Sequence, residues 1–158
     1  MCIRDRNGVK QAMSEGAVNG YPMQDIRVVV HDGKHHSVDS KEIAFVQAGK
    51  KAFLEAVAKA RPIVMEPIVN AEFTIPSDCV GGVTGDLSGM RGMITGTNAL
   101  PDNRALVSGQ VPLQELQGYH SRLKSLTGGE GSFTMDFSHY AEVPPNELKQ
   151  LKAAAEQA

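Results

Sequence analysis

Imidazole, ammonium and hydroxyl groups are concentrated between residues 31 and 39. Lys34, His35 and His36 lie together in a stretch whose Asp, Gly and Ser residues are typical of a surface loop. The lysine ammonium and the histidine rings are hydrogen-bond donors that suit an RNA backbone. Two alternatives use the same residues. The histidines are solvated side chains without a ligand, or they form a weak metal site with His31.

Three basic residues in the second half of the chain could also contact RNA phosphates. Arg91 lies in the run GDLSGMRG, and Arg122 and Lys124 lie in a stretch with leucines at helical spacing. Isolated basic residues beside helix ends are more often solvated, or interact favourably with the C-terminal end of the helix dipole. Both interpretations remain open for each of the three residues.

No catalytic or metal centre is predicted. The run G-x-x-x-x-G-K-[ST], which would cradle nucleotide phosphates, does not occur in the chain. The carboxylates of Asp25, Glu42, Glu66 and Asp86 have no spacing that marks a general acid and base. The two cysteines, Cys2 and Cys79, have no metal-like spacing and suggest no disulfide framework, so they fit a reducing cytoplasm.

Composition limits the classes of protein that this chain can represent. The 158 residues are 41% hydrophobic, which is enough for one ordinary domain or two small ones. The net charge of −2 argues against a free-standing nucleic-acid binder, which usually has a strongly basic face. No apolar run approaches the ~20 residues of a membrane span, so we expect a cytoplasmic protein that does not enter the membrane.

The first part of the chain is predicted to be a truncated β-α segment. Residues 1–6 do not join smoothly to the residues after them, and we interpret them as a non-native scar. A short helix is expected over residues 8–15, and alternation of Ile26, Val28 and Val30 with other side chains predicts a strand. Asp39 and Glu42 have capping-box spacing, so a helix should follow over residues 40–60. Its apolar stripe is predicted to be Ile43, Phe45, Ala52, Phe53, Ala56, Val57 and Ala60.

The second part has the pattern β-α-β-β-α-β, which predicts a ferredoxin-like domain within an α+β chain. Its first strand should cover residues 67–75, and a single helix should carry Leu113, Leu116, Leu123 and Leu126. In the last strand, Phe133, Met135, Phe137 and His139 alternate with polar residues, so we expect these four on the core face. Residues 146–158 are predicted to be a helical tail.

Five stretches, in order, resemble the translational GTPases of the elongation factor G family. They are GYP (20–22), VDSKEIAFVQAGKKAFLEA (38–56), EPI (66–68), GDLSGMRG (85–92) and the run from Gly118 to Pro145. The resemblance implies that residues 7–65 are part of the family's domain IV and that residues 66–145 are its ferredoxin-like domain V. It also implies that GTP and Mg²⁺ bind to domains upstream of this segment, and that the segment itself holds no cofactor.

The resemblance implies a ribosomal partner and specific contacts. The loop bearing Lys34, His35, His36, Ser37 and Asp39 would be a tip loop that contacts tRNA and mRNA at the decoding site. Arg91, Arg122 and Lys124 would contact rRNA, in a domain that faces the stalk base and the sarcin–ricin region. The family usually has an aromatic residue, His and Asp in the tip, consecutive arginines after GDL and G-R-G in the last turn. The departures from this pattern favour a divergent paralogue.

Three other functions remain open. The chain could be a stand-alone ribosome- or RNA-binding module, or part of a GTPase that recycles or protects ribosomes. It could also be a small metabolite-binding protein, because ferredoxin-like domains serve many functions and a fold does not determine one. A defined pocket with convergent polar groups would favour the metabolite hypothesis.

Overall fold

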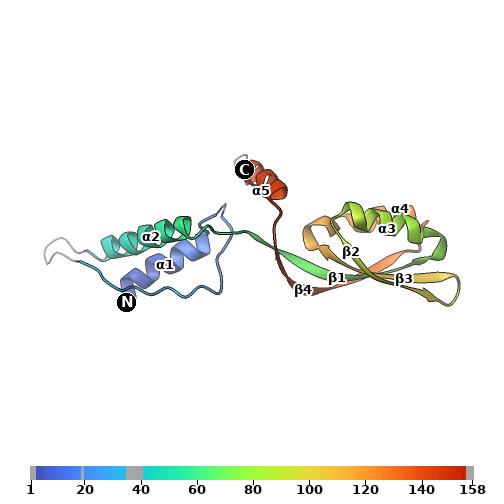
Figure 1. Cartoon of the computed structure of the whole chain (residues 1–158), viewed down its shortest axis with the longest axis horizontal. Helices are drawn as coiled ribbons and strands as arrows, with labels where there is room; N and C mark the ends of the chain where they lie inside the picture. The colour runs from blue at the N-terminus through green and yellow to red at the C-terminus, as the bar shows by residue number, and fades with distance from the viewer. Residues whose placement is uncertain (1–2, 19, 35–40, 156–158) are drawn as a thin grey trace. The chain divides into compact units, whose positions relative to one another are not determined.

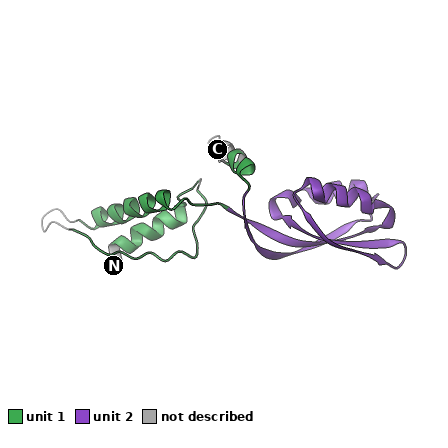
Figure 2. Cartoon of the chain, viewed as in Figure 1, with its two compact units in different colours: residues 1–64, 144–158 green, residues 65–143 purple. Residues whose placement is uncertain are grey.

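The computed structural model describes residues 3–18, 20–34 and 41–155. Its chain divides into two compact units, Met1–Val64 with Pro144–Ala158 and Met65–Val143 (Figure 1, Figure 2). The first unit contains α1 (Ile3–Glu15), α2 (Glu42–Lys59) and α5 (Pro145–Ala155). The second contains β1 (Met65–Pro76), η1 (Ser77–Cys79), α3 (Val80–Gly89), β2 (Met93–Leu100), β3 (Arg104–Pro112), η2 (Leu113–Leu116), α4 (Tyr119–Leu126) and β4 (Ser132–Glu142).

In the first unit, α1 and α2 pack closely against each other (Figure 1). Their small core consists of Val9, Ala12, Phe53 and Val57. The helices approach closely at Gly8, where an added Cβ would lie 2.0 Å from the Val46 carbonyl oxygen. α1 begins at Ile3, so residues 3–6 of the predicted scar form the start of this helix. As expected, α1 ends before Gly16, whose φ of +78° suits glycine.

The predicted strand around Ile26–Val30 is not formed. Residues 26–30 have no secondary structure, and only Val28 packs against the small core. Ile26, Val29 and Val30 are exposed. A strand requires a paired neighbour, and within residues 20–34 the only bridge is the one that joins Tyr21 to Val18. The alternation of side chains therefore gives an extended segment and not a sheet edge.

The start and the buried face of α2 also differ from the prediction. The N-cap is Lys41, which makes no side-chain capping bond, and Glu42 is the first helical residue. A capping box with Asp39 as N-cap is therefore wrong, and Asp39 itself lies outside the described residues. Phe53 and Val57 are the buried residues of the predicted stripe, whereas Ile43 is 62% exposed. The stripe is shorter because the α1 contacts cover only part of α2.

The second unit confirms the α+β, ferredoxin-like prediction. Its four strands form an antiparallel sheet in the order β2-β3-β1-β4, with α3 and α4 on one face (Figure 1). β1 and β3 are central and carry alternating buried residues. The core between sheet and helices contains Val69, Ala71, Phe73, Ile75, Val83, Leu87, Val107, Val111, Leu116, Tyr119 and Leu123.

Two details of this unit differ from the prediction. The leucines of residues 113–126 do not share one helix, because Gly118 at φ +76° separates η2 from α4. On β4, Phe133 packs against the core, but Met135, Phe137 and His139 are exposed. β4 is an edge strand with a register shift opposite Ile68 and Val69. An edge strand has a neighbour on one side only, so alternation along it does not guarantee burial.

Candidate nucleic-acid interface

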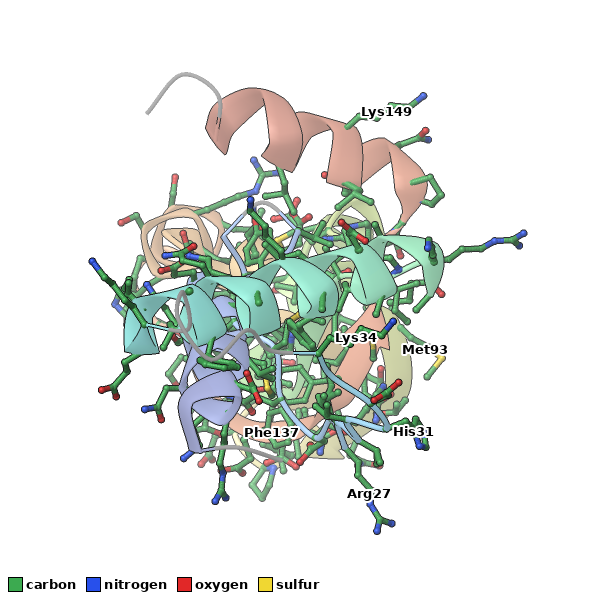
Figure 3. The ribbon with its side chains drawn as sticks, turned by 90° about the vertical axis from the view of Figure 1, so that its left-hand side faces the viewer. Arg27, His31, Lys34, Met93, Phe137 and Lys149 are labelled. Atoms are coloured by element: carbon green, nitrogen blue, oxygen red, sulfur yellow. The ribbon has the colours of Figure 1, made fainter. Side chains whose placement is uncertain are left out.

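Of the predicted tip-loop residues, Lys34 is described and His35, His36, Ser37 and Asp39 lie outside the described residues. Lys34 is exposed at the end of the extended segment that follows Tyr21. Arg27 and His31 are exposed on the same segment, and their side chains project away from the ribbon in Figure 3. The segment therefore presents three nitrogen-bearing side chains on the approach to the loop.

Arg91 is held by two carboxylates within its own unit. Its Nη1 and Nη2 donate to the two carboxylate oxygens of Glu66, at 2.6 and 3.0 Å, and its Nε donates to Glu115 Oε1 at 3.1 Å. The hydrogen bonds that Arg91 donates to Glu66, which is only 8% exposed, raise the pKa of the Arg91 guanidinium. All three guanidinium nitrogens are thus engaged inside the unit, in the bidentate geometry that suits arginine.

Arg122 forms the second arginine–carboxylate pair, between α4 and α3. Its Nε donates to Asp86 Oδ2 at 2.7 Å, and its Nη2 donates to Oδ1. These hydrogen bonds lower the pKa of Asp86 and raise the pKa of Arg122. The Arg122 side chain is nevertheless 69% exposed, so it keeps a solvent-facing surface that could meet a phosphate.

Tyr119 shares the Asp86 carboxylate and is buried. Its hydroxyl donates to Asp86 Oδ2 at 3.4 Å. Burial, with the charge of Asp86, raises the pKa of Tyr119 to about 12. The phenol therefore stays protonated at neutral pH and has no sign of a chemical role.

Lys124 stabilises the end of α4. Its Nζ donates to the carbonyl oxygen of Gly129 at 2.7 Å, across the glycine turn that follows the helix. Gly128 and Gly129 have φ of +61° and +95° there, as the glycines of this turn were expected to allow. Lys124 lies two residues from Arg122, so the two side chains leave different sides of the helix. The three predicted basic residues thus bind separate acceptors within the unit.

The sequence did not identify the acidic partners of these arginines. No sequence pattern marks Glu66, Asp86 or Glu115 as the partner of an arginine. The Arg91–Glu66 and Arg122–Asp86 pairs join residues 25 and 36 positions apart. No local spacing rule reaches over such separations, because the fold alone brings the side chains together.

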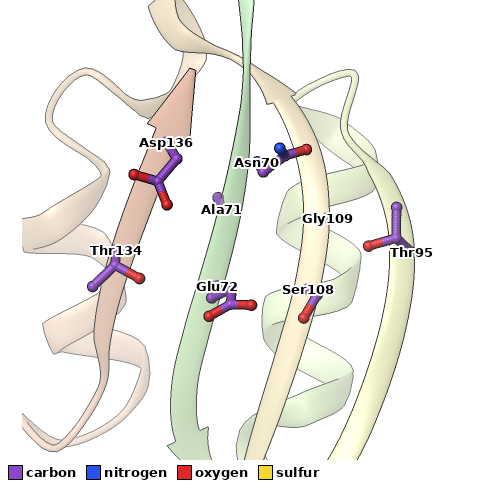
Figure 4. A pocket seen from close by; sticks show the side chains of 8 residues that line it. All are labelled: Asn70, Ala71, Glu72, Thr95, Ser108, Gly109, Thr134 and Asp136. Atoms are coloured by element: carbon purple, nitrogen blue, oxygen red, sulfur yellow. The ribbon is translucent and has the colours of Figure 1, made fainter. Parts of the chain in front are cut away.

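A cavity of about 350 Å³ lies on the sheet, lined by side chains of all four strands (Figure 4). Its lining consists of Asn70, Ala71, Glu72, Thr95, Ser108, Gly109, Thr134 and Asp136. It contains two carboxylates and no basic side chain, so its chemistry does not suit a phosphate.

Among residues 3–18, 20–34 and 41–155, no group of three or more His, Cys, Asp and Glu side chains has the arrangement of a metal site. In the same ranges, no helix has the length and apolar character needed to cross a membrane.

Comparison with known proteins gives two family matches in sequence order. The family described as "Elongation factor G, domain IV" matches residues 6–61, and "Elongation factor G C-terminus" matches residues 63–151. The chain is 50% identical over 144 residues to elongation factor G of Aquifex pyrophilus, covering 91% of this chain and 20% of that protein.

A crystal structure of a protein from Thermus thermophilus is similar in fold. It matches with a TM-score of 0.80 and 36% identity, over 99% of this chain and 24% of the Thermus chain. The chain thus spans about a fifth to a quarter of the relatives that it matches. On these matches, the chain belongs to the elongation factor G family and corresponds to its domain IV and C-terminal segments.

Proposed function

We propose that this chain acts as the ribosome-contacting C-terminal part of a translation elongation factor G, which promotes movement of tRNA and mRNA through the ribosome. The observation that carries the proposal is the pair of family matches, in order, across residues 6–61 and 63–151. The 50% identity to the Aquifex protein supports it. GTP binding and hydrolysis with Mg²⁺ would belong to other domains, since the chain has no phosphate-binding P-loop sequence.

In the first unit, the proposed contacts lie on the exposed segment that leads into the loop. Lys34, with His35, His36, Ser37 and Asp39, would contact the tRNA–mRNA duplex, supported by the exposed Arg27 and His31. Such contacts would be mainly to phosphates, because ammonium and guanidinium groups neutralise the RNA backbone and release counterions. The helix pair α1–α2 would provide the rigid base for this segment.

In the second unit, we propose that Arg122 and Lys124 contact rRNA from either side of α4. The 69% exposure of the Arg122 side chain supports this role. For Arg91, we propose an rRNA contact only through the exposed part of its side chain, which is 27% exposed. Loss of Arg122 should therefore weaken ribosome binding, and not only the contact with Asp86 inside the unit. A higher salt concentration should weaken ribosome binding further.

A chimera tests the translocation proposal. The 144 aligned residues of Aquifex elongation factor G would be replaced by those of this chain, and mRNA movement would be followed by fluorescence on pre-translocation ribosomes. We expect translocation within about tenfold of the Aquifex protein, since tenfold corresponds to only ~1.4 kcal/mol of barrier. A chimera that hydrolyses GTP on ribosomes without moving mRNA would contradict the proposal.

Two variants of the chimera test the proposed tip contacts. Lys34→Ala and His36→Ala should slow translocation, whereas Lys10→Ala, at an exposed position on α1, should not. Equal effects of all three would show that the loop has no special role. If the chimera instead splits ribosomal subunits, with no mRNA movement, the recycling alternative gains support.

The chain itself should bind no GTP. A ligand at 100 times its dissociation constant stabilises a protein by about 2.7 kcal/mol, which raises the melting temperature by several degrees. We expect GTP with Mg²⁺ to leave the melting temperature of this chain unchanged in a thermal-shift assay. A concentration-dependent increase with GTP, absent with the same concentration of sulfate, would overturn this expectation.

A further inference from the structure

One end of the sheet in the second unit is built in a way that should make it fray. β3 pairs with β1 only from Ile68 onward, so Met65, Glu66 and Pro67 pair with β4 alone. A register shift separates this two-stranded ribbon from the rest of the sheet. Figure 1 shows β1 and β4 continuing beyond the other two strands. Isolated two-stranded ribbons are marginally stable in water, and Pro67 has no N–H to donate.

The side chain of Glu66 is nevertheless buried in this weak ribbon. It is held by Arg91, which lies in the α3–β2 turn, and Arg91 is in turn held by Glu115 of η2. We call these three residues the Arg91 cluster. Arg91 has a φ of +57°, a left-handed conformation that is uncommon outside glycine. Arg91 is the first residue after the C-cap of α3, and the Gly92 N–H donates to the Leu87 carbonyl oxygen at 2.8 Å. This conformation therefore ends the helix and places the guanidinium beside both carboxylates.

The position of the cluster gives it a structural consequence. The ribbon contains Met65 and runs opposite Ala141 and Glu142, so both connections between the two compact units leave the sheet at this end. If the ribbon opened, residues 65–67 and 140–142 would leave the sheet and lengthen both connections between the units.

We propose that the Arg91 cluster holds the β1–β4 ribbon closed and thereby sets the length of the two connections between the units. The bidentate Arg91–Glu66 contact joins the ribbon to the α3–β2 turn, and the Glu115 contact joins that turn to η2. Both anchoring segments belong to the well-packed part of the unit, since Leu87 and Leu116 are core residues. The cluster thus determines how far the pairing of β1 with β4 extends toward the two connections.

Amide hydrogen exchange of the full chain tests this proposal, with two variants and a matched control. Glu66→Gln removes the buried carboxylate, and Arg91→Gly removes the guanidinium while permitting the left-handed backbone. Asp86→Asn removes the other bidentate arginine contact of the same unit. Exchange of those amides of Met65, Glu66, Ala141 and Glu142 that donate across the ribbon should be at least about tenfold faster in the first two variants, with Phe73 to Ile75 unchanged. In Asp86→Asn, exchange at the ribbon should not change.

Three results would overturn the proposal. Unchanged exchange at the ribbon in Arg91→Gly would show that the guanidinium does not hold it closed. A uniform increase over all four strands would assign the cluster to global stability and not to the ribbon. An equal increase in Asp86→Asn would show that any arginine–carboxylate pair has this effect. If Glu66→Gln does not fold, the Arg91→Gly result decides alone, because glycine relieves the backbone at that position.

Discussion

Arg122 of α4 donates hydrogen bonds from two nitrogens to the carboxylate of Asp86 on α3, and thereby joins the two helices that cover the sheet. The same arginine was expected from the sequence to face RNA. Because its side chain remains 69% exposed, the two roles do not exclude each other. The pair also gives the second unit a defined response to acid.

Asp86→Asn should lower the melting temperature at neutral pH, and the difference should shrink in acid. Arg122 lowers the pKa of Asp86 in the folded state, so the stabilisation is present above the unfolded pKa of about 3.9. It is lost as the pH falls through the lower folded pKa. Melting temperatures of the unchanged chain and of Asp86→Asn, recorded between about pH 7 and about pH 2, measure this loss of stabilisation. Asp136→Asn, at an exposed position, serves as the control, and a difference that persists at the acid end would contradict the assignment.

Tyr119 should give the second unit a response to alkali. Its pKa is raised to about 12 by burial, while an unfolded tyrosine titrates near pH ~10. The unfolded state therefore releases its proton first, and stability should fall as the pH rises from about 10 to about 12. Absorbance at the phenolate band should show a titration phase that disappears in Tyr119→Phe. If Tyr119→Phe still shows the titration phase near pH ~12, another tyrosine is responsible for it.

The stack of Phe73 on Phe133 should be a main contributor to the stability of the sheet. Phe73 is fully buried, its ring centroid lies 5.3 Å from that of Phe133, and Tyr119 meets it edge-on. Phe73→Ala should cost about 3–5 kcal/mol in urea unfolding. Phe137→Ala makes the same chemical change at a 58% exposed position and should cost less than about 1 kcal/mol. Similar costs for both would mean that β4 is more covered than the structure indicates.

The helix pair of the first unit should depend on glycine at position 8. A methyl group there would meet the Val46 carbonyl oxygen at 2.0 Å, so Gly8→Ala should separate the helices and cost at least about 1–3 kcal/mol. Gly85→Ala on α3 has open space around it and should instead stabilise by about 0.5–1 kcal/mol. Thermal melts followed by circular dichroism compare the two. Stabilisation by both changes would contradict the close approach of α1 and α2.

The second unit should survive limited proteolysis and the first should not. Unit Met65–Val143 has a contiguous core of eleven buried residues, whereas the helix pair has four. Cleavage is expected first between α1 and α2, where residues 20–34 are largely exposed and without helix or strand. Mass spectrometry should therefore find a stable fragment close to residues 66–145. A stable fragment over residues 7–64 would contradict this.

Local physical rules account for the predictions that were confirmed. The order β-α-β-β-α-β follows from the change between two-residue and helical periodicity, and from Gly and Pro at the turns. The glycine turn after α4 was predicted because only such residues readily take φ values like that of Gly129. These rules act over a few residues, so they can be applied without knowing the fold.

Two of the errors share one physical cause. Ile26–Val30 alternates like a strand, but a strand forms only when another segment satisfies its backbone. Phe137 alternates like a core residue, but its exposure depends on β4 being an edge strand. In both cases a distant part of the chain decides the outcome.

The sequence by itself determined the family, the type of nearly every element in residues 65–143 and the absence of a P-loop. The tertiary structure alone decided the position of each strand in the sheet and the carboxylates that Arg91 and Arg122 bind. It also decided that Arg91 contacts both Glu66 at the start of β1 and Glu115 of η2. Periodicity, caps and motifs are properties of neighbouring residues, whereas burial and ion pairing are set by contacts between residues far apart in the chain.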